Sequence, residues 1–216
     1  RINAVLSKTL PLGIKIGEIT GNPLTGYDAG PLSIHDAQTT ILSADKLHVS
    51  PSLINLLQGE LRLSELHITG VSLDYDRLNN LLRQKTADRK ESTWNLPVDK
   101  IRVTNLRTTT PQGKLIIEKA LVKNKHNNFT IQLNGSLDEK RIKADGELLQ
   151  EEDLKRITAG LEWDTARAQV DGVISPSISL KCTFKTFDLS KLHYLIPAVD
   201  RADLRGITSG SVLISK

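Results

Sequence analysis

The chain has 216 residues, a net charge of +4 and an aromatic content of only 4%, and its acidic and basic residues are interspersed along most of its length. So few aromatic side chains argue against bases or sugar rings as ligands, and the mixed charge gives no reason to expect a nucleic-acid partner. The single cysteine excludes an internal disulfide, and no segment approaches the roughly 18 apolar residues that a membrane-spanning helix needs.

The chain opens with a predicted helix followed by a strand. Apolar residues recur at helical spacing over residues 2–10 and Pro11 ends the pattern, which predicts a short amphipathic helix. The period then changes to two, which predicts a strand over residues 14–20. The Gly- and Pro-containing residues 21–30 are expected to form a turn region.

Alternation resumes in the next part of the chain. It predicts strands over residues 32–34, 41–49 and 61–75, and helical spacing predicts short helices over 52–58 and 76–84. The odd-numbered residues of 41–49 are placed on one face of their strand. The four apolar residues of helix 52–58 are placed on its buried side.

The strand over 61–75 carries a change of phase. Its apolar residues slip by one position around Ser64 and Glu65. An extra residue in a strand is how a β-bulge shows in a sequence, and bulges bend sheets. We therefore expect the sheet to curve.

Residues 85–95 (KTADRKESTWN) lack an apolar period and are predicted to form a polar linker or loop. They separate a first unit, residues 1–84, with an N-terminal helix and a first β-groove segment, from a second β-groove segment, residues 96–216. Residues 151–155 are expected to form a short helix or loop. The strands expected in the second segment are 100–106, 114–122, 129–137, 141–149, 159–163, 167–174, 177–185 and 203–214.

The most regular unit is an antiparallel hairpin over residues 129–149. Its apolar and small residues fall on odd-numbered positions up to Leu137 and on even-numbered positions from Ile142, so one face is apolar and the other polar. Asn134 and Gly135 would ordinarily be a favoured hairpin turn. The alternation runs through them, so the turn is placed further along.

These patterns predict an all-β fold, an elongated, curved, mostly antiparallel sheet with a few short helices. One alternative is a closed sandwich or barrel, in which the apolar face is an ordinary core. The other is an open or half-closed sheet, in which that face is a groove.

The sequence offers no group for catalysis or metal binding. Its five histidines are scattered, and none pairs with a second His or Cys at metal-ligand spacing. Ser33, His35 and Asp36 resemble triad members, but neighbouring residues of a strand point to opposite faces and are not expected to converge. Cys182 is in phase with apolar residues and is interpreted as a small buried hydrophobe. We expect no enzyme activity, no cofactor and no metal.

Function is therefore sought in the apolar face. A continuous, charge-free groove suits a lipid, since a hydrocarbon chain of about fifteen methylenes gains roughly 12 kcal/mol on full burial. The residues expected to line this groove are Phe129, Ile131, Leu133, Ile142, Ala144, Leu148, Ala168, Val170, Ile178, Leu180 and Phe184. Two alternatives are a scaffold that docks client β-strands by edge augmentation and a closed β domain that only spaces other parts of a longer chain.

Several segments together resemble the TamB family of Gram-negative envelope proteins, a pattern that AsmA-like relatives share. The likeness is distributed over nearly the whole chain. The resembling segments are residues 10–21 (LPLGIKIGEITG), 44–49 (ADKLHV), 52–66 (SLINLLQGELRLSEL), 68–73 (ITGVSL), 96–103 (LPVDKIRV), the hairpin at 135–148, and 202–212.

This resemblance implies a fragment from near the N-terminus of a long periplasmic protein, anchored in the inner membrane by a helix that precedes residue 1. The absence of methionine, including at position 1, also indicates a fragment or processed chain. Such proteins are thought to form a β-taco, a rolled sheet with an apolar groove. The implied partners are phospholipid, carried towards the outer membrane, and an Omp85-type barrel protein with which outer-membrane proteins are assembled.

Overall fold

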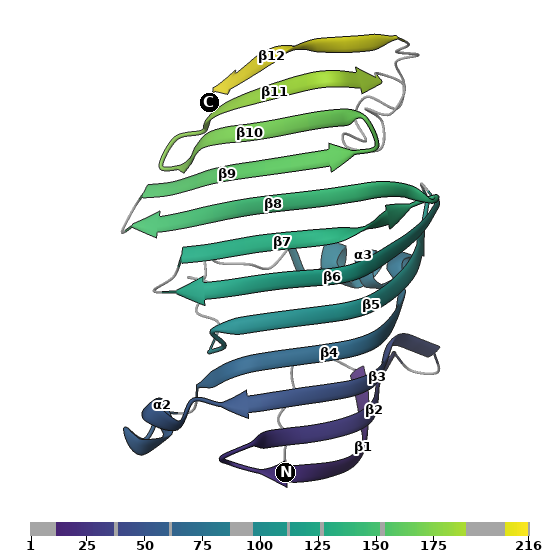
Figure 1. Ribbon diagram of the computed structural model, residues 1–216, viewed down its shortest axis with the longest axis vertical. Coiled ribbons are helices and arrows are strands. Elements are labelled where there is room, and N and C mark those ends of the chain that lie inside the picture. Colours follow the sequence, from purple (N-terminus) through teal and green to yellow (C-terminus); the bar gives the residue numbers. More distant parts are fainter. Residues whose placement is uncertain are drawn as a thin grey trace.

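The computed structural model describes one β-sheet with two short helices between its strands (Figure 1). The described residues are 12–36, 39–60, 62–86, 97–111, 113–125, 128–151, 154–188 and 206–215. The helix predicted over residues 2–10 lies outside them.

The strands of the sheet follow one another in chain order. They are β1 (Leu12–Asn22), β2 (Gly26–Asp36), β3 (Thr39–Pro51), β4 (Leu63–Asp74), β5 (Lys100–Thr110), β6 (Gly113–Lys125), β7 (Asn128–Leu137), β8 (Lys140–Glu151), β9 (Leu154–Trp163), β10 (Ala166–Ser175), β11 (Ser179–Asp188) and β12 (Ile207–Ser215). Each strand pairs with its neighbours in sequence, and only the β4–β5 pairing is parallel.

Among the described strands, β1 and β12 stand at opposite ends of the sheet and do not pair with each other. The sheet is therefore open (Figure 1). The prediction of an all-β, curved, mostly antiparallel fold with a few short helices is confirmed. The alternative of a closed sandwich or barrel is wrong.

The two helices lie where the sequence placed them. Helix α2 (Leu53–Leu57) connects β3 to β4, and α3 (Tyr75–Thr86) follows β4 directly. The predicted burial of α2 is wrong, because none of its residues is buried and Leu57 is 90% exposed. This short helix projects beyond the ends of β3 and β4 (Figure 1).

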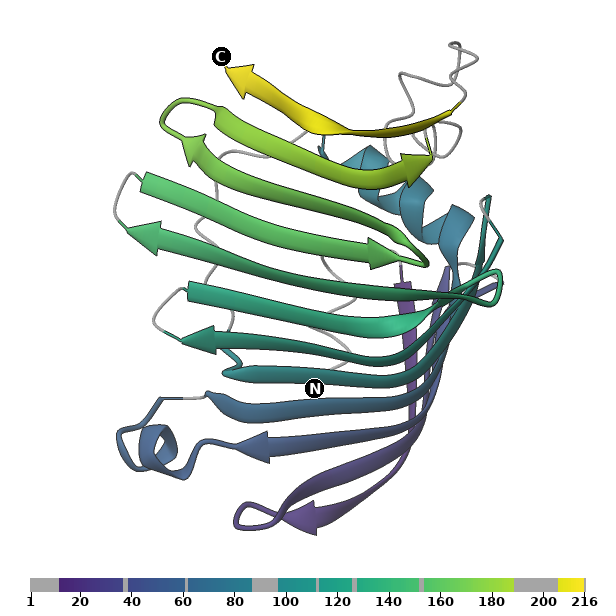
Figure 2. The ribbon, with the colours of Figure 1, turned by 45° about the horizontal axis from the view of Figure 1, so that its top comes forward.

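Helix α3 and the segment after it explain the parallel pair. A parallel connection must return to the starting end of the sheet, and α3 is the described part of this connection between β4 and β5. Figures 1 and 2 place α3 behind the sheet, on the side towards which the strands curl. The linker predicted at 85–95 lies almost entirely outside the described residues, and the segments before and after it contribute to one sheet.

The β7–β8 hairpin has the predicted form. Leu137 pairs with Lys140 across a turn made by Asp138 and Glu139, whose φ values of 46° and 66° are those of the mirror-image turns that suit hairpin twist. Strand β7 runs straight through Gly135, as the alternation indicated.

Two loop predictions are wrong. Residues 21–30 were expected to form turns, yet β2 begins at Gly26, because the Gly30–Pro31 step is an irregularity within the strand and not its boundary. Residues 151–155 were expected to form a helix or loop, yet β9 begins at Leu154. In both segments, backbone hydrogen bonds to a neighbouring strand hold the residues in extended conformation.

A column of extra residues crosses β1 to β6. In each of these strands, two residues of the inner, apolar face stand three positions apart instead of two. The pairs are Ile16 and Ile19, Ala29 and Leu32, Ala44 and Leu47, Ile68 and Val71, Val103 and Leu106, and Ile117 and Ala120. The extra residue restores the apolar face after the strand bends.

The same column corrects the predicted face of residues 41–49. Leu42 and Ala44 share the inner face with Leu47 and Val49 because Asp45 is part of the irregularity. The slip predicted near Ser64 is confirmed, since Ser50 pairs with Glu65 but Pro51 pairs with Leu63. Figure 2 shows the resulting curl of β1–β6.

The column of extra residues ends at β6, where Ile117 pairs with Gly135 of β7. The backbone of β6 comes so close to Gly135 that a larger residue there should destabilise the fold. A Cβ at Gly135 would collide with the carbonyl oxygen of Ile116, and the neighbouring backbone would have to move. Gly135→Ala should therefore lower the free energy of unfolding by about 1–3 kcal/mol, measured by urea denaturation.

Gly146 is the matched control. It lies on the same face of the adjacent strand, but its Cβ would meet Thr158 O at an ordinary 3.5 Å. Gly146→Ala should change the free energy of unfolding by no more than about 0.5 kcal/mol. Equal losses in the two variants would contradict the close approach at Gly135.

Candidate ligand-binding groove

Two rows of paired residues cross all the strands on the inner face without interruption. The first inner row is Ile19, Ala29, Leu47, Ile68, Val103, Ala120, Leu133, Ala144, Leu161, Ala168, Phe184 and Gly210. The second inner row is Gly21, Tyr27, Val49, Leu66, Ile101, Val122, Ile131, Gly146, Ala159, Val170, Cys182 and Val212. Neither row contains a charged residue.

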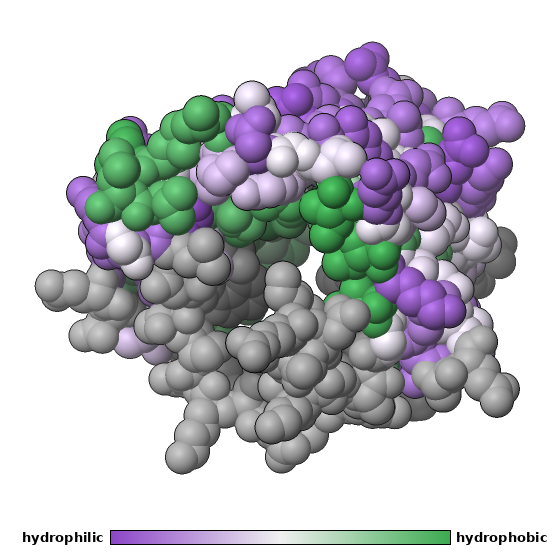
Figure 3. Space-filling model, turned by 90° about the horizontal axis from the view of Figure 1, so that it is seen from below, coloured by the Kyte–Doolittle hydropathy of each residue, from purple (hydrophilic) through white to green (hydrophobic). Residues whose placement is uncertain are grey.

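The curvature of the sheet turns these rows into the lining of a trough. Figure 3, seen from the β1 end, shows hydrophobic side chains inside the hollow and mostly hydrophilic ones on the outside, apart from a hydrophobic patch at the upper left. Paired residues share a face, so the rows run across the strands along the length of the sheet. At about 4.8 Å per strand interval, the lining extends about 53 Å from β1 to β12.

The trough deepens into a cavity of about 490 Å³ over β7 to β11. The side chains that line it are apolar. They are Ile131, Ala144, Leu148, Ile157, Ala159, Leu161, Ala168, Val170, Cys182 and Phe184, with Gly146 between them. Asp145 and Glu147 also border the cavity, but their pairing with Gly160 and Thr158 places their side chains on the outer face.

The predicted lining residues fall into three groups. Six of them line the cavity: Ile131, Ala144, Leu148, Ala168, Val170 and Phe184. Four others, Phe129, Leu133, Ile142 and Leu180, share the inner face through their pairing but lie outside the cavity. Ile178 precedes β11 and is 37% exposed, so the structure does not bring it to the cavity.

Sequence reasoning missed several lining residues. Ala159 and Leu161 lie in the strand predicted over 159–163 but were not named as lining, and Ile157 precedes that predicted strand because β9 was expected to begin later than it does. Cys182 was interpreted as a small buried hydrophobe; it is half-buried and lines the cavity. A groove segment was predicted in residues 1–84, but no lining residue of β1–β6 was named, and the spacing of three residues in these strands conceals their shared face.

The outer face carries the charges, many of them in ion pairs. Asp28 contacts Lys46 Nζ and His48 Nδ1, each at 3.0 Å, and hydrogen bonds from these two groups lower the pKa of its carboxyl. Glu65 accepts a 2.9 Å hydrogen bond from Lys100, which likewise lowers its pKa. The separation of charge from apolar surface is therefore kept strand by strand.

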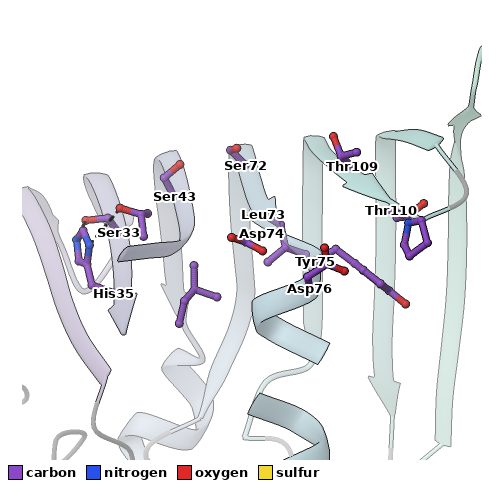
Figure 4. A pocket seen from close by; sticks show the side chains of 13 residues that line it. Ser33, His35, Ser43, Ser72, Leu73, Asp74, Tyr75, Asp76, Thr109 and Thr110 are labelled. Carbon is purple, nitrogen blue, oxygen red and sulfur yellow. Dashed lines mark hydrogen bonds between the residues drawn. The ribbon is translucent and has the colours of Figure 1, made fainter. Parts of the chain in front are cut away.

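A second, polar cavity of about 870 Å³ lies at the rim where α3 begins (Figure 4). In Figure 4, Ser33, Ser43, Ser72 and Thr109 lie along the ends of β2 to β5, and Asp74 and Asp76 lie beside the start of α3. Asp74 accepts a hydrogen bond from the Arg77 N–H at 3.1 Å and pairs with the Arg77 guanidinium at 3.3 Å.

The polar cavity corrects part of the argument against a catalytic triad. Ser33 and His35 are two residues apart, share a face and approach to 2.8 Å, so they do converge. The other ring nitrogen of His35 lies 3.1 Å from Thr40 Oγ1, while Asp36 pairs with Thr39 on the opposite face. The Ser–His contact thus has a hydroxyl where a triad has its carboxylate.

No three or more His, Cys, Asp or Glu side chains come together to hold a metal ion in the part of the chain that the structure describes. None of the described helices has the length and hydropathy of a membrane span. Comparison of the chain with models of protein families, with curated proteins and with solved structures gave no match.

His67 predicts how stability should depend on pH. Its pKa is lowered from 6.5, first by burial and then by the Arg102 charge. Below pH 6.5 the unfolded chain therefore gains a proton at this site that the folded chain does not, and stability falls. His67→Gln should lose less stability than the wild type between about pH 7 and 5, measured as the urea midpoint.

The carboxylates do not obscure this effect. The pKa of Glu65 is lowered from 4.5, so its contribution to stability is lost only at more acidic pH. Identical slopes for His67→Gln and the wild type between about pH 7 and 5 would contradict the lowered pKa of His67.

Proposed function

We propose that the trough binds the acyl chains of phospholipids and conducts them along the sheet, without catalysis. The observation that supports this function is the pair of inner rows, which are apolar from β1 to β12. A lipid chain moving along such a lining meets no charged side chain, whose contact with a hydrocarbon would be costly. An ordinary hydrophobic core requires only that each side chain be buried locally. A path for a lipid chain requires an apolar lining that is continuous from strand to strand, as these rows are.

The dimensions suit a single acyl chain. The cavity covers β7 to β11, about 19 Å at about 4.8 Å per interval. An acyl chain reaches through about half of a hydrocarbon core that is about 30 Å thick. Burial of about fifteen methylenes is worth roughly 12 kcal/mol, which leaves a surplus after the cost of ordering the chain.

The resemblance to the TamB family supports a cellular setting for this function. In that setting the chain lies in the periplasm, is anchored in the inner membrane by a preceding helix, and passes phospholipid towards the outer membrane. The family resemblance itself rests on the sequence segments quoted above.

A second candidate is a scaffold that assists outer-membrane protein assembly with an Omp85-type partner. One observation favours it. Strand β12 (ITSGSVLIS) forms an edge of the described sheet without a charged residue, and Leu213 is 73% exposed. Uncharged edges of this kind pair readily with another strand.

Photocrosslinkers at Phe184 and Leu133 distinguish the two candidates. In cells, both positions should capture phospholipid if the trough conducts acyl chains. Capture of protein partners alone would contradict lipid conduction and favour the scaffold.

A charge in the lining should block binding. Val170→Asp places a carboxylate in the second inner row and should reduce phospholipid capture at Phe184 by at least about ten-fold, because the charge must be desolvated or exclude the chain. Gln169→Asp adds the same charge to the outer face of β10 and should leave capture unchanged. Equal capture by the two variants, each with the wild-type circular dichroism spectrum, would count against an acyl chain in the cavity.

Cys182 supplies a second test without a crosslinker. As a lining residue, its thiol should react with a maleimide several-fold more slowly when phospholipid is bound. Lys181→Cys in a Cys182→Ala background reports on the outer face of the same strand and should show no protection. Unaltered reactivity of Cys182 at saturating lipid would place the lipid elsewhere.

A further inference from the structure

A basic pocket of about 580 Å³ lies at the rim of the trough, where β4 and β5 begin and β6 ends, beside α2 (Figure 1). Its charged lining consists of Arg62, Lys100, Lys123, Lys125 and a single carboxylate, Asp99. The remaining lining residues, such as Ser64, are polar and uncharged. The pocket therefore holds more positive than negative charge.

The ion pairs leave part of that charge unbalanced. Arg62 Nη2 lies 2.6 Å from Asp99 Oδ1, and Lys100 Nζ lies 2.9 Å from Glu65 Oε2. No carboxylate among the described residues lies within ion-pair distance of Lys123 or Lys125. Among the described residues, two ammonium groups at the same rim thus have no carboxylate partner.

The strand register also brings positive charges close to one another. Lys100 on β5 is directly opposite Lys123 on β6, and Lys125 follows two residues later on the same face. Like charges directly opposite each other in a sheet are destabilising. An anion held between them would convert that repulsion into attraction.

We propose that this pocket binds a phosphate group. Lysine ammonium groups bind phosphate as point charges, and Arg62 adds a planar donor. The described lining has no aromatic side chain on which a base could stack, so a single phosphate suits it better than a nucleic acid.

The place of the pocket suits the headgroup of a lipid, an assignment that rests on the function proposed above. Asn124 borders the pocket and pairs with Phe129, and both residues are buried on the inner face. Lys123 and Lys125 flank Asn124 and point to the opposite, outer face, so a headgroup bound there would join the apolar lining by passing around the end of β6. Free phosphate offers the same chemistry and is the other source.

Three probes separate these sources: a short-chain phosphatidic acid, the diacylglycerol with the same chains, and inorganic phosphate. Each is titrated into the whole chain while amide chemical shifts are followed in two places. Lys123 and Lys125 report on the pocket, and Ala159 and Val170 report on the cavity.

Phosphatidic acid should bind about ten-fold more tightly than diacylglycerol, as one charge-assisted hydrogen bond would give. The double variant Lys123→Ala with Lys125→Ala should abolish this difference. The control, Lys181→Ala with Lys185→Ala, removes the same charge from the outer face of β11 and should preserve it. Loss of the difference in the control would overturn the pocket, because net charge alone would then explain binding.

Equal affinity for phosphatidic acid and diacylglycerol in the wild type, with no shift of the lysine amides, would also overturn the phosphate pocket but leave the acyl groove intact. In another outcome, inorganic phosphate shifts the lysine amides as much as phosphatidic acid does and binds with the same affinity. That result would support the pocket and assign it to free phosphate. If phosphate shifts the lysines while no lipid shifts Val170, the pocket stands and the proposed lipid function fails.

Discussion

The fold depends on keeping apolar side chains on one face of a sheet that bends. Strict alternation sends successive residues to opposite faces, so a slip of one residue in any strand would turn its apolar set towards solvent. In β1–β6 each strand carries its extra residue at the level of its neighbour's, from the Ile16–Ile19 step to the Ile117–Ala120 step. The bends are thereby aligned into one fold line, and the curvature on which the trough depends is shared by six strands.

The same constraint separates the chemistry of the two faces. Along β10, Ala168 and Val170 line the cavity while Arg167 and Asp171 form ion pairs outside. These outer pairs are half-exposed and contribute little stability individually. Their main effect is to keep the strand in its register, because a charged residue moved to the inner face would lose both its partner and its hydration. The two inner rows of the described strands are free of charge because the charged residues of these strands lie on the outer face.

Much of the fold could be predicted from the sequence, because antiparallel hairpins are local and their alternation is visible. The β7–β8 hairpin and its turn at Asp138 follow from period-two counting alone. The residues that share the inner face of β1–β6 could not be predicted in this way, because Asp45 and its counterparts shift the phase by one residue. The exposure of Leu57 and the parallel pairing of β4 with β5 depend on which elements become neighbours in the folded chain. The local sequence pattern does not contain that information. The Ser33–His35 contact could have been anticipated, since residues two apart share a face.

The candidate site divides in the same way. Six lining residues of the cavity were predicted, and all lie in stretches of their strands over which the alternation is uninterrupted. The basic pocket was not predicted, since Lys100 and Lys123 come together only through the register of β5 on β6. Sequence distance conceals such pairs, and only the hydrogen-bonded ladder reveals them.

The chain-order arrangement of the strands gives the molecule the physics of a repeat protein. Each strand contacts its neighbours and little else, so stability is approximately a sum of nearest-neighbour interfaces, and folding can begin at one hairpin and spread. The β4–β5 junction differs, because its parallel ladder is joined by a helix crossover and cannot form as a local hairpin. Cooperativity should be lowest there. In such an architecture the trough can lengthen or shorten by whole hairpins without repacking the remainder.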